Sequence, residues 1–341
     1  MLGVKVRKAG AEKIKKYLAR QKLMDINYRL ISSNEFIYFP ISNPDSRNRR
    51  FLSIQNAEIV DMKFDKNTVQ PSYRERLRKS LGKGYSAAVK SYDIIGDIAL
   101  IDSDNEAKAR KTAKVIMGLN KNVKTVLSKG GPVSGRYRIR KYEYVAGKRK
   151  YDTVYNENGC SFKIDVRKSF ISTRLAYERN RVSELVRDGE NVAVMFAGAG
   201  PFAIEIAKKH KNAKVLAIEL NRQAYKYMLE NIKLNREKNV NAQLGDVNRL
   251  APKYPRFANR IIMPLPKSSY EFLGSVLKMA KNGCVVHYYA FGKSDSAFED
   301  NILGLKEFFS KNGRRIKVVF KRVVKTYSAS EIEVVIDFRI Y

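Results

Sequence analysis

Short apolar runs alternate with amphipathic stretches along the second half of the chain, from about residue 165. Residues 191–196 (NVAVMF) have the length and composition of a buried strand, whereas 201–210 (PFAIEIAKKH) repeats apolar residues at helical spacing. The same alternation predicts strands at 213–220, 260–265 and 284–291, helices at 222–237 and 268–280, and an antiparallel pair at 317–327 and 331–341. Residues 165–341 are therefore expected to form an α/β domain with a Rossmann-like, doubly wound and largely parallel sheet.

Residues 1–68 have the pattern of a small α+β domain that precedes the rest. An amphipathic helix is expected near 11–21, and strands are expected at 36–41 and 57–64. Residues 42–50 (SNPDSRNRR) between those strands are rich in turn-forming residues and arginine, which predicts a loop. Such a loop is either solvated or in contact with phosphate groups.

A middle α+β domain is expected over residues 69–164. It begins with a basic helix at 72–81, followed by a strand pattern at 91–102 and a helix at 105–119. Residues 135–166 then alternate polar and apolar positions over two or more strands.

Arginine and tyrosine are interleaved where this alternation begins, in the sequence GRYRIRKYEY that contains Arg136, Arg138 and Arg140. Guanidinium groups bind phosphates and tyrosine rings stack on unpaired bases, so the mixture suits single-stranded nucleic acid. An ordinary solvated sheet face rich in tyrosine is the alternative.

The charge of the chain also points to a polyanionic partner. There are 67 Lys and Arg against 34 Asp and Glu, a net charge of +33. The first 150 residues carry 34 basic and 14 acidic side chains, or +20, and the remainder carries 33 and 20, or +13. The N-terminal half is therefore expected to bind most of the nucleic acid.

Composition excludes several classes of protein. With 44% hydrophobic residues the chain is too apolar for a disordered basic tail. No apolar run is long enough for a membrane span, and no secretory signal precedes the first domain, so a soluble cytoplasmic protein is expected. Two cysteines and two histidines build neither a disulfide framework nor a zinc cluster, so no metal is expected. His210 is expected to be solvated, and His287 to be hydrogen-bonded within a strand.

The most informative segment is MFAGAGPF, followed by the acidic residue Glu219. A strand ends at Phe196, the chain turns through Gly198 and Gly200, and Pro201 stands at the first helical position. In such a fold, glycines let a ligand approach the backbone and an acid at the end of the second strand accepts hydrogen bonds from ribose hydroxyls. A nucleoside-type cofactor is expected.

Two cofactors remain open from these residues alone. Gly198, Gly200 and Ala203 satisfy the G-x-G-x-x-A pattern of a dinucleotide site, which would make the protein an NAD-dependent dehydrogenase. Against NAD, Pro201 has no N–H to offer a pyrophosphate. Asp246 follows the expected third strand, where it could receive an adenine, which favours S-adenosylmethionine.

The ordered motifs RYRIR, YEYVAG, RLAYERNRV, MFAGAGPF, AIELN, GDV, LPK and HYYAFGK resemble the archaeal and eukaryotic tRNA (guanine-37-N1)-methyltransferases. The resemblance covers nearly the whole chain, including the small leading domain. It implies a class I S-adenosylmethionine-dependent methyltransferase that binds tRNA through its first two domains and methylates N1 of guanosine 37 in the anticodon loop. We expect a monomer.

The resemblance also implies residue roles. Glu178 matches the general base that removes the N1 proton, and Arg138 matches the residue that stabilises negative charge on O6 of guanine. Without the resemblance, an ion pair between Glu178 and Arg181 three residues later is the simpler account of the glutamate. Phe170 matches a tyrosine beside the flipped base, where it retains stacking and loses a hydroxyl.

Further positions match the binding sites of the family. The substrate side is expected to include Arg174, Pro264, Pro266 and Lys267. Contacts with the cofactor are expected from Arg179, Phe196, Gly198, Gly200, Glu219, Leu220, Asp246, Val247 and Pro264.

Pro264 departs from the family, which usually has asparagine before LPK. A proline here resembles the archaeal subgroup that also methylates C7 of 4-demethylwyosine to give isowyosine, so a second activity is an open alternative. Val194 likewise replaces a common acid. A non-catalytic RNA-binding protein with a degenerate methyltransferase domain is a further alternative.

Overall fold

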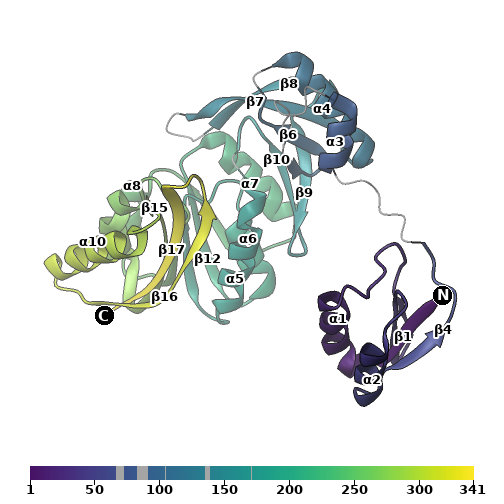
Figure 1. Ribbon diagram of the computed structural model, residues 1–341. Coiled ribbons are helices and arrows are strands. Elements are labelled where there is room, and N and C mark those ends of the chain that lie inside the picture. Colours follow the sequence, from purple (N-terminus) through teal and green to yellow (C-terminus); the bar gives the residue numbers. More distant parts are fainter. Residues whose placement is uncertain (67–72, 83–90, 104, 135–138, 170) are drawn as a thin grey trace. The chain divides into compact units, whose positions relative to one another are not determined.

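A computed structural model of the chain describes residues 1–66, 73–82, 91–103, 105–134, 139–169 and 171–341 (Figure 1). These residues form two compact units, Met1–Arg76 and Leu77–Tyr341. Within the described ranges, no helix is both long and apolar enough to cross a membrane.

The first unit is an antiparallel sheet with two helices, which agrees with the expected α+β class, although the sequence predicts only the first of the two helices. Its strand order is β2-β3-β1-β4. The elements are β1 (Leu2–Arg7), α1 (Ala11–Arg20), β2 (Ile31–Ser32), β3 (Phe36–Pro40), α2 (Ser46–Ile54) and β4 (Glu58–Asp61). Ile14 and Leu18 of α1 are buried in the core beside Val4 of β1, which accounts for the amphipathic pattern of that helix.

The expectation of a loop over residues 42–50 is wrong, because α2 begins inside it. The side chain of Asp45 caps this helix by accepting a hydrogen bond from the Asn48 backbone N–H at 2.7 Å. Leu52 anchors the other end in the core with no exposed surface. The cap and the buried Leu52 stabilise the helix more than the neighbouring turn-forming residues disfavour it.

The second unit begins with the middle domain. Its four-stranded sheet has the order β5-β6-β7-β8. Helix α3 (Tyr73–Leu81) contains the boundary between the two units. The elements that follow are β5 (Asp93–Ile95), β6 (Ile98–Ile101), α4 (Glu106–Leu119), β7 (Thr125–Ser134) and β8 (Ile139–Gly147), and then the hairpin β9 (Asp152–Glu157) and β10 (Cys160–Asp165). The helix expected at 105–119 is confirmed, with Asn105 as its N-cap.

A seven-stranded sheet of order β13-β12-β11-β14-β15-β17-β16 forms the rest of the unit. The first five strands in this order are parallel, and β17 and β16 are antiparallel to their neighbours. The strands are β11 (Asn191–Met195), β12 (Lys214–Glu219), β13 (Val240–Leu244), β14 (Ala258–Met263), β15 (Ala280–Lys293), β16 (Ile316–Thr326) and β17 (Glu331–Ile340). The Rossmann-like domain and its terminal antiparallel pair are thereby confirmed.

Helices cover both faces of this sheet, as Figure 1 shows for α5 and α6 on one side and α8 and α10 on the other. The first layer consists of α5 (Ala176–Leu185), α6 (Pro201–Lys209) and α7 (Arg222–Leu234). The second consists of α8 (Val247–Leu250), α9 (Leu273–Met279) and α10 (Ala297–Lys311). Helix α10, which the sequence analysis did not predict, buries Leu305 and Phe309 against the sheet.

Asparagine side chains attach the β9–β10 hairpin to helix α7 and to the turn after β11. Asn231 of α7 accepts a hydrogen bond from Lys163 N at 2.7 Å and donates to the carbonyls of Lys163 and Ala199. Asn235 forms a matching pair of bonds with the backbone of Ser161. Because Ala199 lies within the glycine turn, these amides hold the hairpin and the turn in one arrangement.

One of the two predictions about histidines agrees with the structure and the other does not. His287 is fully buried in β15, as expected. The expectation of a solvated His210 is wrong, because its Nε2 lies 2.8 Å from the Ser183 carbonyl and its Nδ1 3.3 Å from Asp188. The end of α6 packs against α5, so His210, which follows the last residue of α6, is held by contacts with α5 and with Asp188.

Candidate functional site

The carboxyl ends of four parallel strands bring the expected cofactor residues to one edge of the sheet. Met195 of β11 pairs with Ile218 of β12, so Phe196 and Glu219 are the next residues on each strand. Glu219 in turn pairs with Leu244 of β13, two residues before Asp246. Ligands of open α/β sheets bind at this edge.

The turn after β11 has a backbone that requires glycine. Phe196, Gly198 and Gly200 all have positive φ, with values of 59°, 59° and 91°. A Cβ atom added to Gly200 would lie 2.9 Å from Cγ of Met228, so even alanine would need a shift of its neighbours. Pro201 begins α6, as expected, and leaves the first helical position without an N–H.

Glu219 closes the turn from the neighbouring strand. One carboxylate oxygen accepts a hydrogen bond from Gly198 N at 2.7 Å, and the other accepts from Asn221 N at 2.6 Å. Burial raises the pKa of Glu219, while the backbone N–H groups of Asn221, Gly198 and Leu220 oppose that rise. A carboxylate has about four lone-pair positions, so these three N–H groups leave one that a ribose hydroxyl can use.

Asp246 and Val247 lie beside this carboxylate. Gly245 N donates to the Glu219 carbonyl at 2.9 Å, which attaches the β13 loop to the end of β12. The Asp246 side chain caps α8 by accepting from Asn248 N at 2.9 Å, and Val247 is buried. The structure therefore gathers the glycine turn, Glu219 and the residues 246 and 247 at a single edge, and these residues fit a nucleoside.

Pro264, Pro266 and Lys267 follow β14 at the same edge, because Val194 of β11 pairs with Ile262. The loop is held by Ser269, whose hydroxyl donates to the Leu265 carbonyl at 2.9 Å. Beside it is a cavity of about 530 Å³. Its walls are Pro266, Lys267, Ser269, Tyr270, Tyr288, Ala290, Phe291, Asn301 and Glu331.

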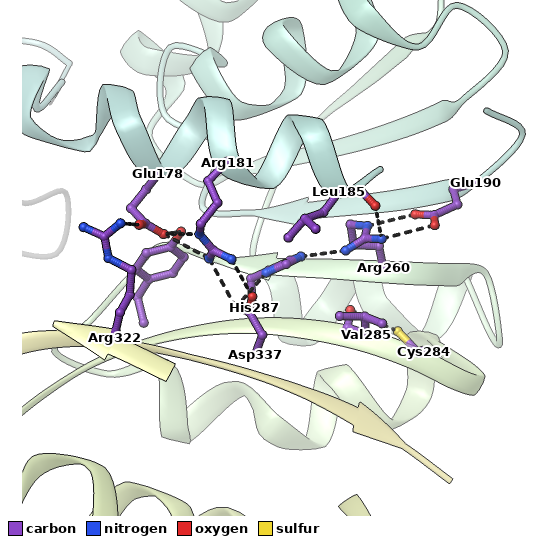
Figure 2. A network of polar contacts seen from close by, with 11 residues as sticks. Glu178, Arg181, Leu185, Glu190, Arg260, Cys284, Val285, His287, Arg322 and Asp337 are labelled. Carbon is purple, nitrogen blue, oxygen red and sulfur yellow. Dashed lines mark hydrogen bonds and ion pairs between the residues drawn. The ribbon is translucent and has the colours of Figure 1, made fainter. Parts of the chain in front are cut away.

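Glu178 lies in the first turn of α5 and is 1% exposed (Figure 2). The expected ion pair with Arg181 is present, with Nε donating to Oε2 at 3.0 Å. The Tyr289 hydroxyl donates to the same oxygen at 3.1 Å. The Tyr289 ring in turn lies 6.2 Å from that of Phe202, two residues after Gly200, so this aromatic pair links Glu178 to the first turn of α6.

The structure places other expected residues away from the turn or does not describe them. Arg179 is buried among Glu157, Glu205 and the Ser172 carbonyl. Arg174 is half exposed and donates to Asp93 at 3.0 Å. Arg138 and Phe170 lie outside the described residues, so their expected roles stay predictions.

Sequence reasoning missed the residues that surround Glu178 from the last two strands. Arg322 of β16 lies 3.3 Å from Oε1 of Glu178, and its guanidinium lies over the Tyr177 ring at 4.5 Å. Asp337 of β17 binds Arg181 with both oxygens, at 2.6 and 3.3 Å. The sequence contains a signal for Asp337, which is the one acid within the apolar run VVIDF.

This arrangement can perform proton transfer beside a nucleoside site. A buried carboxylate with one oxygen fully hydrogen-bonded and the other facing a partly exposed arginine can accept a proton from a bound substrate. Among the described residues, no group of three or more histidine, cysteine or acidic side chains could hold a metal ion.

Three family profiles match successive parts of the chain. Residues 3–47 match the tRNA methyltransferase 5 N-terminal domain, 73–150 match the TYW2 N-terminal domain, and 153–319 match the TRM5/TYW2 methyltransferase domain. The matches follow the same order as the three sets of elements described above.

Similar proteins cover the whole chain. The tRNA (guanine(37)-N(1))-methyltransferase Trm5b of Pyrococcus abyssi is 36% identical, over 99% of each chain. Its crystal structure superposes with a TM-score of 0.74 at 34% identity, covering 100% of this chain and 99% of that one. A solved complex of aTrm5 and tRNALeu gives a TM-score of 0.70 at 31% identity and covers 100% of both chains.

Proposed function

The chain belongs to the TRM5/TYW2 methyltransferase family, and we propose that it transfers the methyl group of S-adenosylmethionine to N1 of guanosine 37 in tRNA. The correspondence over the full length, N-terminal domain included, carries this proposal. A shared methyltransferase domain alone would not show which atom of which substrate receives the methyl group.

In the proposed reaction Glu178 removes the proton from N1 of guanine, whose pKa lies above neutral. The electron pair of that N–H bond stays on N1, which becomes the nucleophile, and the proton bonds to the carboxylate. S-adenosylmethionine, when bound, supplies a methyl group on a positively charged sulfur. Arg138 is proposed to stabilise the negative charge that develops on O6.

The cofactor is proposed to lie against the turn of Gly198 and Gly200. The free lone pair of Glu219 would accept a ribose hydroxyl, and the residues 246 and 247 would contact the base. Phe196 presents its ring beside that of Phe272, with centroids 4.7 Å apart, which closes one side of the turn with apolar surface. Leu220 stays a predicted contact of the cofactor, whereas the buried contacts of Arg179 with Glu157, Glu205 and Ser172 favour a structural role for that arginine.

The RNA is proposed to bind the basic N-terminal half, which carries +20 of the net +33. Guanosine 37 must leave the stacked anticodon loop before N1 can be reached, and extrusion of the base would supply that access. Arg174, Pro266 and Lys267 are proposed to contact the extruded nucleotide. The proposal includes a monomeric enzyme of the cytoplasm.

Methyl transfer from radiolabelled S-adenosylmethionine to tRNA transcripts tests this function. We expect label to enter transcripts with guanosine at position 37 and not matched transcripts with adenosine there. Absence of transfer to both would favour a non-catalytic RNA-binding protein. Equilibrium dialysis with labelled NAD and S-adenosylmethionine checks the cofactor, and a preference for NAD would contradict the proposal.

A second activity on 4-demethylwyosine is supported by one observation, Pro264 directly after β14. Proline has neither a side-chain amide nor a backbone N–H to donate at this edge. The protein therefore offers fewer hydrogen bonds that would select guanine over another base as the methyl acceptor. The same assay on tRNA that carries 4-demethylwyosine decides whether C7 is methylated.

A further inference from the structure

A continuous chain of buried and partly buried polar groups extends from Glu178 between α5 and the last strands (Figure 2). It contains three acids and three arginines, so its formal charges cancel. In order they are Glu190, Arg260, His287, Asp337, Arg181, Glu178 and Arg322.

Asp337 holds Arg181 in a fixed position. Its two oxygens accept from Nη1 and Nη2 of that arginine, and the Asp337 side chain is 2% exposed. Two parallel bonds from a planar guanidinium leave it little rotational freedom. Arg181 therefore presents Nε toward Glu178 in one orientation.

His287 lies against Asp337 from the other side. An arginine can only donate, so Nε2 of His287 must accept the hydrogen bond from Arg260 at 2.8 Å. The ring proton then lies on Nδ1, 2.8 Å from Oδ1 of Asp337. Arg260 is itself held by Glu190 and by the Leu185 carbonyl, so this end of the chain is anchored in the fold.

The two oxygens of Glu178 are unequal as a result. Oε2 accepts from Arg181 and from the Tyr289 hydroxyl. Oε1 is buried and has no hydrogen-bond partner among the residues that the structure describes, and the Arg322 guanidinium lies 3.3 Å from it. The Arg322 side chain is 33% exposed, so it is the one member next to Glu178 that can move toward solvent.

We propose that Asp337 is a positioning residue for methyl transfer, which acts through Arg181 to hold Glu178 so that Oε1 takes the N1 proton. The inference rests on the proposed function of Glu178 as the base. The N1–H bond breaks, its electron pair stays on N1, and the proton bonds to Oε1. Oε2 keeps its donors throughout, so the carboxylate does not rotate during the transfer.

A double-mutant cycle on the full chain tests the inference. Single-turnover methyl transfer is measured with saturating S-adenosylmethionine and tRNA for Asp337→Asn, Glu178→Gln and the double variant. We expect Glu178→Gln to slow the step by about 100-fold or more. Asp337→Asn should slow it by about ten-fold alone and by less than about two-fold in the Glu178→Gln background.

Binding measurements separate positioning from a loss of structure. The dissociation constants of Asp337→Asn for tRNA and S-adenosylmethionine should stay within about three-fold of the unmodified protein. Glu237→Gln is a matched control, since it neutralises another carboxylate that is 2% exposed and bound to a cation, Lys211, without a link to Glu178. Its single-turnover rate should not change.

Equal slowing by Asp337→Asn in both backgrounds would overturn the inference and leave the proposed function intact. A near-normal rate for Glu178→Gln would instead remove Glu178 as the base, and the inference with it. If Asp337→Asn does not fold, Arg181→Lys takes its place in the cycle, because it keeps the charge and loses the paired bonds. The same non-additivity with Glu178→Gln is then expected, and its absence would contradict the inference.

Discussion

Replacing Arg179 with methionine is expected to lower the stability of the fold strongly and to change the affinity for the cofactor only slightly. The Arg179 guanidinium donates to Glu157, at 2.7 Å from Nη2 to Oε2, and to the Ser172 carbonyl at 2.9 Å. Glu205 lies 3.4 Å from its Nε. These partners come from β9, α6 and the segment before α5, so one side chain joins three parts of the second unit.

The magnitude follows from burial. The side chains of Arg179, Glu157 and Glu205 are 2%, 4% and 2% exposed, so methionine would leave Glu157 as a buried charge without a cation. Breaking such a pair on one side costs about 3–5 kcal/mol. For a unit of this size that corresponds to a fall in Tm on the order of 10 °C.

Thermal unfolding followed by circular dichroism measures the loss, and calorimetric titration measures the affinity for S-adenosylmethionine well below Tm. We expect the large fall in Tm together with an affinity changed by less than about three-fold. A fall of under about 2 °C with an affinity weakened more than about ten-fold would refute the reasoning, since it would mean that Arg179 contacts the cofactor directly.

Three further predictions concern the turn, the pH dependence and the RNA. Gly200→Ala should lower stability by about 2–4 kcal/mol, because it adds a left-handed backbone cost to the contact with Met228, and should weaken binding of S-adenosylmethionine in the same titration. Gly189→Ala is its control, since φ is 82° there with open space around the Cβ, and only the backbone cost of about 1 kcal/mol remains. Burial and the neighbouring Glu157 raise the pKa of Glu205, so the folded state keeps a proton that the unfolded state loses above pH 4.5. The free energy of unfolding should therefore fall as pH rises through neutral, by up to about 1.4 kcal/mol per unit, and Glu205→Gln should flatten that slope in urea titrations at several pH values. Affinity for tRNA, measured by filter binding, should fall steeply and linearly in log–log form with salt, and an affinity indifferent to salt would contradict the electrostatic grip.

The order of elements in the large domain could be predicted because each depends on a local pattern. Strand β11 is an apolar run, and α6 follows a turn that needs glycine at position 200. Asn105 marks the start of α4 in the sequence as clearly as it does in the structure. Helix α2 was missed because its cap, Asp45, lies among residues that also form turns.

The surroundings of Glu178 could be predicted only in part. Its pair with Arg181 is local, three residues apart, and was expected. The contact between Arg181 and Asp337 spans 156 residues, and no periodicity reveals which arginine a distant acid will meet. His287 was expected to be a hydrogen-bonded strand residue because an apolar run encloses it, whereas its partners Arg260 and Asp337 depend on the strand order.

The identity of the methylated atom decides whether the protein acts on N1 of guanosine 37. Transcripts with guanosine 37 are incubated with the protein and S-adenosylmethionine, digested to nucleosides and analysed by mass spectrometry against standards. We expect 1-methylguanosine from position 37 with the unmodified protein, and much slower formation of it with Glu178→Gln. A methyl group on another atom or another nucleotide, or an equal yield from both proteins, would contradict it.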